Sequence, residues 1–258
     1  MNNKSAKQIL KEYRLKLVGV VLAYIAILAL LTLVVMPISV VLGMLGIVVL
    51  GLSVRKPIEK IKTKDLEGVI FEELDPQKFN ELLELGVFKK STRHHVLCAV
   101  SLGDHEKALD IIFNQNAKNI NPIDICNNIY RKGYICFEKG EFDKLAEVVK
   151  EYNYLKKQFP KFAMAFDSFT VFDKFDAFAD EDYEYVVDVC DIDLKEINPQ
   201  KQNHKLTRIN VGFYRAVSLY KLGRLDEARK GFEDLIEFAP KMYKAKLAKE
   251  YIDLIDKA

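Results

Sequence analysis

The side chains best suited to chemistry are scattered along this chain of 258 residues. His94 and His95 are neighbours, and a helix would point them about 100° apart, so they cannot easily hold one metal ion together. His105 falls in a predicted turn, and His204 falls in a polar loop. We therefore interpret the four histidines as ordinary surface residues and predict no metal site.

The four cysteines include no CxxC pair, the spacing that is typical of metal and redox sites. Each cysteine lies in an apolar run with helical character. We interpret them as reduced core residues rather than as metal ligands or disulfide partners. They are Cys98, Cys126, Cys136 and Cys190.

The sequence also lacks the common catalytic motifs. HExxH, GxSxG, a P-loop and a dinucleotide fingerprint do not occur, and the carboxylates show no catalytic pairing. We expect that the protein is not an enzyme and takes no cofactor. The formal net charge of +2 argues against a nucleic-acid binder that works through bulk charge.

Residues 17–54 contain no Asp, Glu, Lys or Arg. The block consists of LVGVVLAYIAILALLTLVV (17–35) and ISVVLGMLGIVVLGLSV (38–54), separated by Met36 and Pro37. As helices, the two runs would each reach about 26–28 Å, close to the thickness of a hydrocarbon core of about 30 Å. We predict a transmembrane helical hairpin that turns at Pro37; the alternative is a buried hairpin in a soluble protein.

Basic residues flank the hairpin on both sides and predict its orientation. Because basic flanks stay in the cytoplasm, we expect both ends there, in the plasma membrane of a bacterium. Gly43, Gly46 and Gly51 could also allow a homo-oligomer through the second span. The basic flanks are Lys4, Lys7, Lys11, Arg14 and Lys16, then Arg55, Lys56, Lys60, Lys62 and Lys64.

The sequence therefore predicts four parts. A basic cytoplasmic N-terminus (1–16) precedes the hairpin (17–54), and a charged linker (55–74) follows it. A helical domain covers 75–258 and begins with Asp75 as an N-cap and Pro76 in the first helical turn.

Helix-turn-helix units recur in this domain. Three stretches share an apolar or small residue seven positions before a glycine: HVLCAVSLGDHEKALDIIF, RKGYICFEKGEFDKLAEVVKEY and AVSLYKLGRLDEARKGFEDLIEFAP. In the third, Ala216 and Ala228 would let two helices approach closely, Phe232 would fill the space to the next helix, and Pro240 would end the unit.

A fourth unit, FAMAFDSFTVFDKFDAF and ADEDYEYVVDVC, would turn near Asp180. The four turns, at 103, 140, 180 and 223, are then 37, 40 and 43 residues apart, which is typical of an α-solenoid. The aromatic residues crowded into this unit predict thicker packing: Phe162, Phe166, Phe169, Phe172, Phe175 and Phe178.

This pattern resembles the tetratricopeptide repeat (TPR) family over residues 207–240, and also over 126–160 and 92–115. Residues 162–196 fit less well, because they lack the glycine and the paired small residues. The resemblance implies an all-α, TPR-like solenoid of about four helix pairs, with a capping helix after Pro240. The alternative is a helical bundle without repeats.

In the TPR family, partner peptides commonly lie in a groove lined by the first helix of each pair. The resemblance implies that a peptide or helical segment of a protein partner would contact matching positions here. These predicted groove residues are Arg93, Leu97, Tyr130, Tyr134, Phe137, Phe213, Val217 and Tyr220. The alternative is that several of them pack between helices.

Eleven acidic residues lie between Asp167 and Glu196, opposed only by Lys174 and Lys195. This stretch is either a solvated face or a surface for a basic partner.

Taken together, these features predict a membrane-anchored cytoplasmic scaffold that binds a protein partner. The alternative is a regulatory or structural subunit of a small oligomeric transporter or channel.

Overall fold

The computed structural model describes residues 4–35, 40–89, 91–116, 121–162, 170–198 and 204–257. Their regular structure is entirely helical, and no strand occurs in these ranges, which confirms the all-α class. The chain forms two compact units, Met1–Val87 and Phe88–Ala258.

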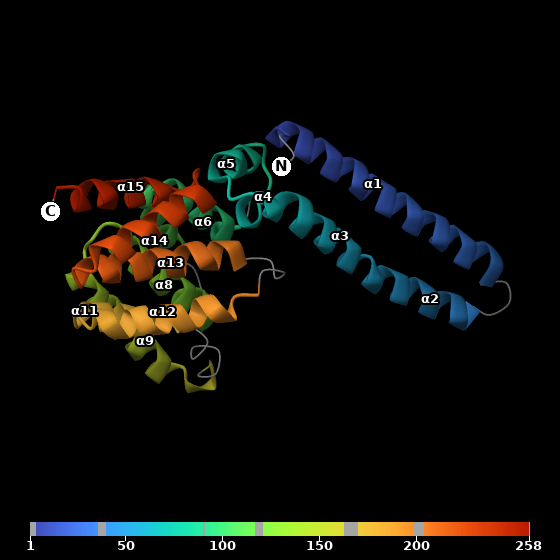
Figure 1. The fold of residues 1–258 in the computed structure, drawn as a ribbon. Helices are drawn as coiled ribbons and strands as arrows, with labels where there is room; N and C mark the ends of the chain where they lie inside the picture. The colour runs from blue at the N-terminus through green and yellow to red at the C-terminus, as the bar shows by residue number, and fades with distance from the viewer. Residues whose placement is uncertain are drawn as a thin grey trace. The chain divides into compact units, whose positions relative to one another are not determined.

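The first unit contains two long antiparallel helical segments (Figure 1). The first segment packs against both parts of the second. The predicted turn at Met36–Ser39 lies outside the described residues. The elements are α1 (Ala6–Leu30), the π-helical turn η1 (Leu31–Val35), α2 (Val40–Ser53), α3 (Arg55–Lys62), the π-helical turn η2 (Thr63–Glu67), α4 (Gly68–Phe71) and α5 (Pro76–Glu84).

The ends of these helices follow local chemistry. Ser5 and Gln8 form a reciprocal capping box at the start of α1. The Asp75 carboxylate accepts a hydrogen bond from the Lys78 amide at 3.0 Å, and Pro76 stands in the first turn of α5, as predicted. Gly86, with φ of +85°, follows the helix in the left-handed conformation.

The stretch predicted as a charged linker differs from that expectation. Residues 55–71 are helical throughout, and only the turn η2 has π-helical geometry. Leu66, Ile70 and Phe71 are buried in the first unit, where η2 and α4 pack against α5. Apolar residues set among the lysines and acids thus form a small core, and the first unit extends to Val87 rather than ending before residue 75.

The second unit is a succession of antiparallel helix pairs that pack on one another. The turns predicted at 103, 140, 180 and 223 all connect two helices, and Gly103, Gly140 and Gly223 adopt positive φ there. The elements are α6 (Thr92–Leu102), α7 (His105–Asn116), α8 (Pro122–Glu138), α9 (Asp143–Gln158), η3 (Pro160–Phe162), α11 (Val171–Ala179), α12 (Tyr183–Glu196), α13 (His204–Lys221), α14 (Leu225–Phe238) and α15 (Tyr243–Ile255).

Small residues and aromatic rings shape this core. A side chain on Gly231 would meet Cβ of Ala216 at 3.1 Å, so α13 and α14 approach closely, as the small residues predict. The ring of Phe232 stacks on Tyr251 of α15 at 4.9 Å between centroids and thus fills the space to the next helix. The predicted aromatic packing is present at Phe172, Phe175 and Phe178, which are buried, but not at Phe162, which is exposed. Phe166 and Phe169 lie outside the described residues.

Candidate functional site

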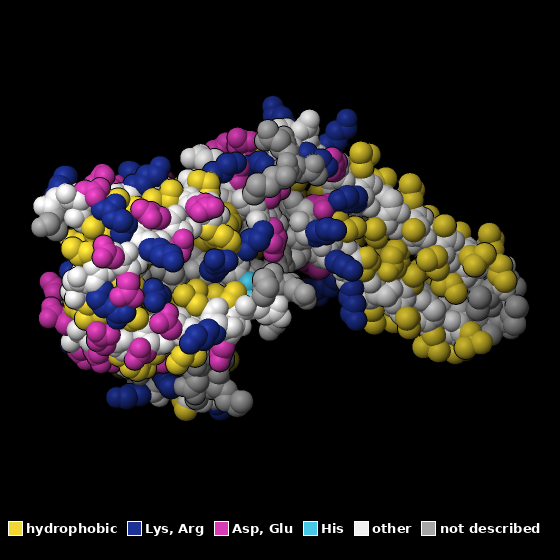
Figure 2. All heavy atoms as spheres, viewed as in Figure 1, with side chains coloured by type: hydrophobic (Ala, Val, Ile, Leu, Met, Phe, Trp, Pro, Cys, Tyr) yellow, Lys and Arg dark blue, Asp and Glu magenta, His cyan; other side chains and the backbone are white. Residues whose placement is uncertain are grey.

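The two long helices of the first unit expose an apolar surface instead of burying it. Ala6–Val34 and Val40–Phe71 are each long and apolar enough to cross a membrane. Leu33 is 77% exposed and Leu52 is 74% exposed. Figure 2 shows hydrophobic side chains covering this surface, with Lys and Arg gathered where the apolar stretch ends. An exposed apolar surface of this length is typical of a segment that contacts lipid.

Contacts inside the hairpin involve its few polar and small residues. The side chain of Leu31 lies 3.2 Å from the Cβ that a residue larger than glycine would place at Gly46, so α2 approaches the first segment closely there. Tyr24 and Ser53 share a hydrogen bond of 3.4 Å between their hydroxyl oxygens. Lys16 forms an ion pair with Asp65 at 2.6 Å, beyond the uncharged block on both segments.

The predicted groove residues divide into two sets. Tyr134, Phe137, Phe213 and Val217 are buried packing residues, which agrees with the alternative interpretation for these four. Helix α15 contributes to the burial of two of them: the ammonium of Lys244 lies 4.0 Å from the ring centroid of Tyr134 and 5.9 Å from that of Phe213. The accessible set comprises Arg93, which is exposed, and Leu97, Tyr130 and Tyr220, which are half-buried.

A buried cluster of charged side chains connects α7, α8 and α15, and sequence reasoning missed it. One carboxylate oxygen of Glu138 pairs with Lys244, and the other lies 2.7 Å from Nε2 of His105. Burial lowers the pKa of Lys244, and the neighbouring Glu138 carboxylate opposes that shift. The ring of Tyr243 completes the cluster, edge-on to His105 at 5.2 Å.

This cluster fixes the last helix to the beginning of the second unit. Glu138 and Lys244 are 106 residues apart, and each is almost fully buried. A buried carboxylate between an ammonium and an imidazole is electrostatically satisfied, and losing one partner would leave a costly uncompensated charge. We therefore interpret it as a packing device. The sequence signal was faint: Glu138 and Lys244 are single charges beside aromatic residues.

The histidine interpretation is wrong at two positions. His94 is buried and stacks on Phe88 with 3.9 Å between ring centroids. His105 is largely covered, because Glu138 and Tyr243 pack against it. Both residues fall on helix faces that turn inward, and an imidazole with a polar partner can occupy such a position.

The prediction that the cysteines lie in the core is confirmed for three of the four, and Cys136 is half-buried. All four thiols are free, and Cys98, Cys126 and Cys190 are buried. Burial raises the pKa of Cys126 and of Cys190 to about 12, so both thiols stay protonated at neutral pH. Within the described ranges, no group of three or more His, Cys, Asp or Glu side chains is arranged to hold a metal ion.

The acidic stretch is partly neutralised by neighbouring basic side chains. Lys174 is buried and pairs with Asp193 at 2.7 Å, and Arg215 pairs with Asp191 at 2.6 Å. Burial and the neighbouring carboxylates raise the pKa of Asp176. Asp167, at the start of the stretch, lies outside the described residues. These ion pairs reduce the net negative charge that the acidic stretch would present to a basic partner.

A tyrosine packed between helices of the second unit predicts a loss of stability in alkali. Burial raises the pKa of Tyr251 to about 12, whereas an unfolded tyrosine titrates near 10. Between these values the folded chain binds the proton and the unfolded chain does not, so stability falls as pH rises from about 10 to about 12.

We expect Tyr251→Phe, which removes the titrating group, to reduce the steepness of this loss. Urea unfolding at several alkaline pH values would measure it. Identical slopes for the parent and the variant would mean that Tyr251 does not hold its proton in the folded domain.

No protein-family model matches the chain, and comparisons with curated proteins and with solved structures also give no significant match.

Proposed function

We propose that the protein is a membrane-anchored scaffold with a TPR-like domain that binds a protein partner at the cytoplasmic face of a plasma membrane. The observation that carries this proposal is the contrast between its two units. The first exposes a long apolar hairpin, and the second packs its helices around its own core.

The distribution of charge supports this arrangement. The uncharged residues 17–54 are bounded by basic residues at both ends. Basic flanks favour the cytoplasmic side, and an even number of spans satisfies both flanks at once. A hairpin of this kind would keep the helical unit at the membrane and raise the effective concentration of its partner there.

The regular helix pairs support the TPR-like interpretation of the second unit. Their turns recur every 37–43 residues along the chain, and small residues occupy the close contact between α13 and α14. In the structure, α15 also packs against α6, so its role goes beyond that of a terminal cap.

The accessible half of the predicted groove is the proposed contact for the partner. Arg93 is exposed, and Tyr220 is half-buried, with its ring 5.3 Å from that of Tyr251. Arginine and tyrosine are enriched among residues that dominate binding energy. Neither side chain belongs to the buried set that includes Tyr134 and Phe213.

We expect the double variant Arg93→Ala and Tyr220→Ala to reduce capture of the partner about tenfold or more, because single anchors of this kind contribute about 2 kcal/mol. The measurement is cross-linking in cells, extraction of the full chain and quantification of what co-purifies. Arg229→Ala with Tyr185→Ala is the matched control, since both of these side chains lie on the surface of the same unit.

Equal capture by both double variants would mean that the partner binds elsewhere. A loss of melting temperature in Arg93→Ala with Tyr220→Ala would show that these residues support the fold instead.

A second candidate is a subunit of an oligomeric transporter or channel. One observation favours it: among the described residues, no atom lies within 4 Å of the Cβ position at Gly51, so this glycine could receive another copy of the hairpin. A ring of defined size after detergent extraction would favour this candidate. A monomer that co-purifies with a soluble protein would favour the scaffold.

A further inference from the structure

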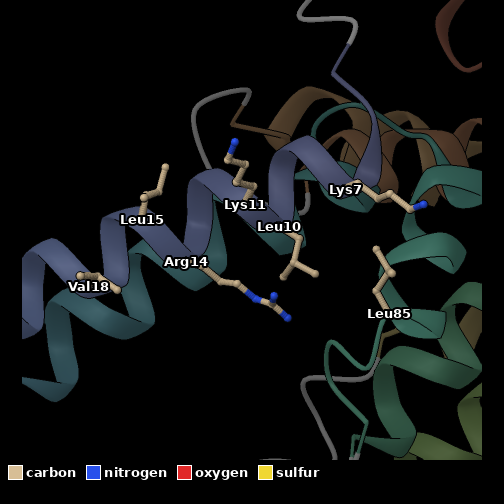
Figure 3. Close-up of a pocket in the computed structure, with 7 residues that line it drawn as sticks. All are labelled: Lys7, Leu10, Lys11, Arg14, Leu15, Val18 and Leu85. Atoms are coloured by element: carbon tan, nitrogen blue, oxygen red, sulfur yellow. The ribbon is translucent and has the colours of Figure 1, made fainter.

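A groove of about 380 Å³ lies on the first unit, between α1 and the end of α5. Three basic side chains, Lys7, Lys11 and Arg14, contribute to its lining. The rest of the lining is apolar and includes Leu10 of α1 and Leu85, the residue that follows α5. In Figure 3, Leu10 and Arg14 point toward the space facing Leu85, and Lys7 lies at one end of it.

The three basic groups are exposed, and within the described residues none of them forms an ion pair or hydrogen bond. The other two lysines of this flank differ, because Lys4 pairs with Glu12 and Lys16 pairs with Asp65. Lys7 and Lys11 are four residues apart on one helix, a spacing at which like charges repel. The groove thus concentrates positive charge that the protein itself does not neutralise, and a bound anion would relieve the repulsion.

The groove also crosses the predicted edge of the membrane. Lys7, Lys11, Arg14 and Val18 follow one another at the spacing of a single helix face, and the uncharged block begins at residue 17. Val18 lies about 6 Å beyond Arg14 along the helix axis. Leu15 and Val18 line this end of the groove and are exposed. One end of the groove therefore suits a phosphate, and the other suits the first carbons of an acyl chain.

We propose that this groove is a binding site for an anionic phospholipid of the cytoplasmic leaflet. Arg14, Lys7 and Lys11 bind the headgroup phosphate, and the acyl chain lies along Leu15 and Val18. Basic pockets at this depth beside membrane helices are suited to anionic headgroups. The inference rests on the proposed membrane anchoring of residues 17–54, and it adds a lipid class that the anchor would select.

The apolar part of the groove distinguishes a lipid from free phosphate. Leu10, Leu15, Val18 and Leu85 have no favourable contact to offer to a small hydrated anion. These side chains do offer a favourable apolar contact to the acyl chain of a lipid that is already in the membrane. A lipid would therefore bind through two kinds of contact, and only the phosphate part would weaken as salt rises.

The test uses the full chain reconstituted into vesicles of equal parts phosphatidylcholine and phosphatidylglycerol. Spin-labelled versions of the two lipids report which one is immobilised at the protein surface. We expect the parent to prefer phosphatidylglycerol. The triple variant Lys7→Gln, Lys11→Gln and Arg14→Gln should lose this preference by about tenfold or more, since each basic residue near the surface contributes about 1 kcal/mol.

The matched control is Lys56→Gln, Lys60→Gln and Lys64→Gln. These lysines are also exposed and belong to the other basic flank, but they do not line the groove. If the control loses the preference as strongly as the groove variant, general charge attraction explains it, and the site is overturned. An equal affinity of the parent for both lipids also overturns it.

Two further measurements distinguish a lipid ligand from free phosphate and test the membrane anchor separately. Inorganic phosphate that displaces the labelled phosphatidylglycerol completely would make a free phosphate the ligand and would overturn the lipid assignment. Alkaline washing of the vesicles tests the anchor itself. A chain that washes off overturns both proposals, whereas a chain that stays and shows no lipid preference overturns the lipid site alone.

Discussion

Replacing Ile25 and Val48 by arginine should release the chain from membranes. Ile25 is 55% exposed on α1, and Val48 is 58% exposed on α2, both near the middle of the uncharged runs. A guanidinium at the centre of a bilayer costs about 2.5–3.5 kcal/mol, so the pair costs about 5–7 kcal/mol. We expect most of the double variant to appear in the supernatant after alkaline extraction of membranes, whereas the parent remains in the pellet.

The control for this prediction is Ile192→Arg with Leu254→Arg in the second unit. Ile192 is also 55% exposed, and Leu254 is 47% exposed, so the chemical change and the local exposure are closely matched. These substitutions should leave extraction unchanged, because both side chains lie on a unit that we place in water. If both double variants extract alike, the hairpin is an apolar surface of another kind and does not reside in lipid.

Glu138→Ala should destabilise the second unit by about 3–5 kcal/mol, because it leaves Lys244 buried without its counter-ion. His105 loses the same partner. Urea unfolding of the full chain in detergent would measure the change through tyrosine fluorescence, since ten of the twelve tyrosines belong to the second unit. The midpoint should fall by at least about 1 M urea.

Glu141→Ala is the matched control for this variant. Glu141 also carries two basic partners, Lys139 at 2.8 Å and Lys144 at 3.0 Å, but this network lies at the surface. Removing this surface network should lower the free energy of unfolding by about 1 kcal/mol or less.

Glu138→Leu combined with Lys244→Met should recover most of the stability, because it removes both buried charges together. A Glu138→Ala protein as stable as Glu141→Ala would show that α15 does not dock on α8.

Local signals in the sequence predicted much of this fold. The uncharged block at 17–54 predicted the two long apolar helices, and Asp75-Pro76 predicted the start of α5. Gly103, Gly140 and Gly223 predicted turns because a left-handed backbone is least costly for glycine. Each of these residue patterns determines the structure of its own segment of the chain. A single sequence is therefore enough to detect it.

The remaining features depend on contacts between distant parts of the chain. The ion pair between Glu138 and Lys244 joins residues whose spacing carries no pattern. The burial of Tyr134 and Phe213 depends on where the last helix packs, and a helical position alone does not separate a groove from a core. The small core around Ile70 was missed because its apolar run, Val69–Phe71, is only three residues long and charged residues precede and follow it.

Labelling of single introduced cysteines in intact cells would show whether the hairpin spans the membrane with the helical unit inside the cell. The native thiols are free and mostly buried, and replacing them by serine would provide a clean background if the variant keeps its helical content. Two sites are then compared with a membrane-impermeant thiol reagent. They are Ser39→Cys at the predicted hairpin turn, which lies outside the described residues, and Lys246→Cys on the exposed face of α15.

The proposed anchor predicts that Ser39→Cys reacts in intact cells and that Lys246→Cys reacts only after the cells are opened. Reaction of Lys246→Cys from outside would contradict the cytoplasmic placement of the helical unit. If both sites react only after lysis, the hairpin does not cross the membrane, and the account of a membrane-spanning scaffold is wrong.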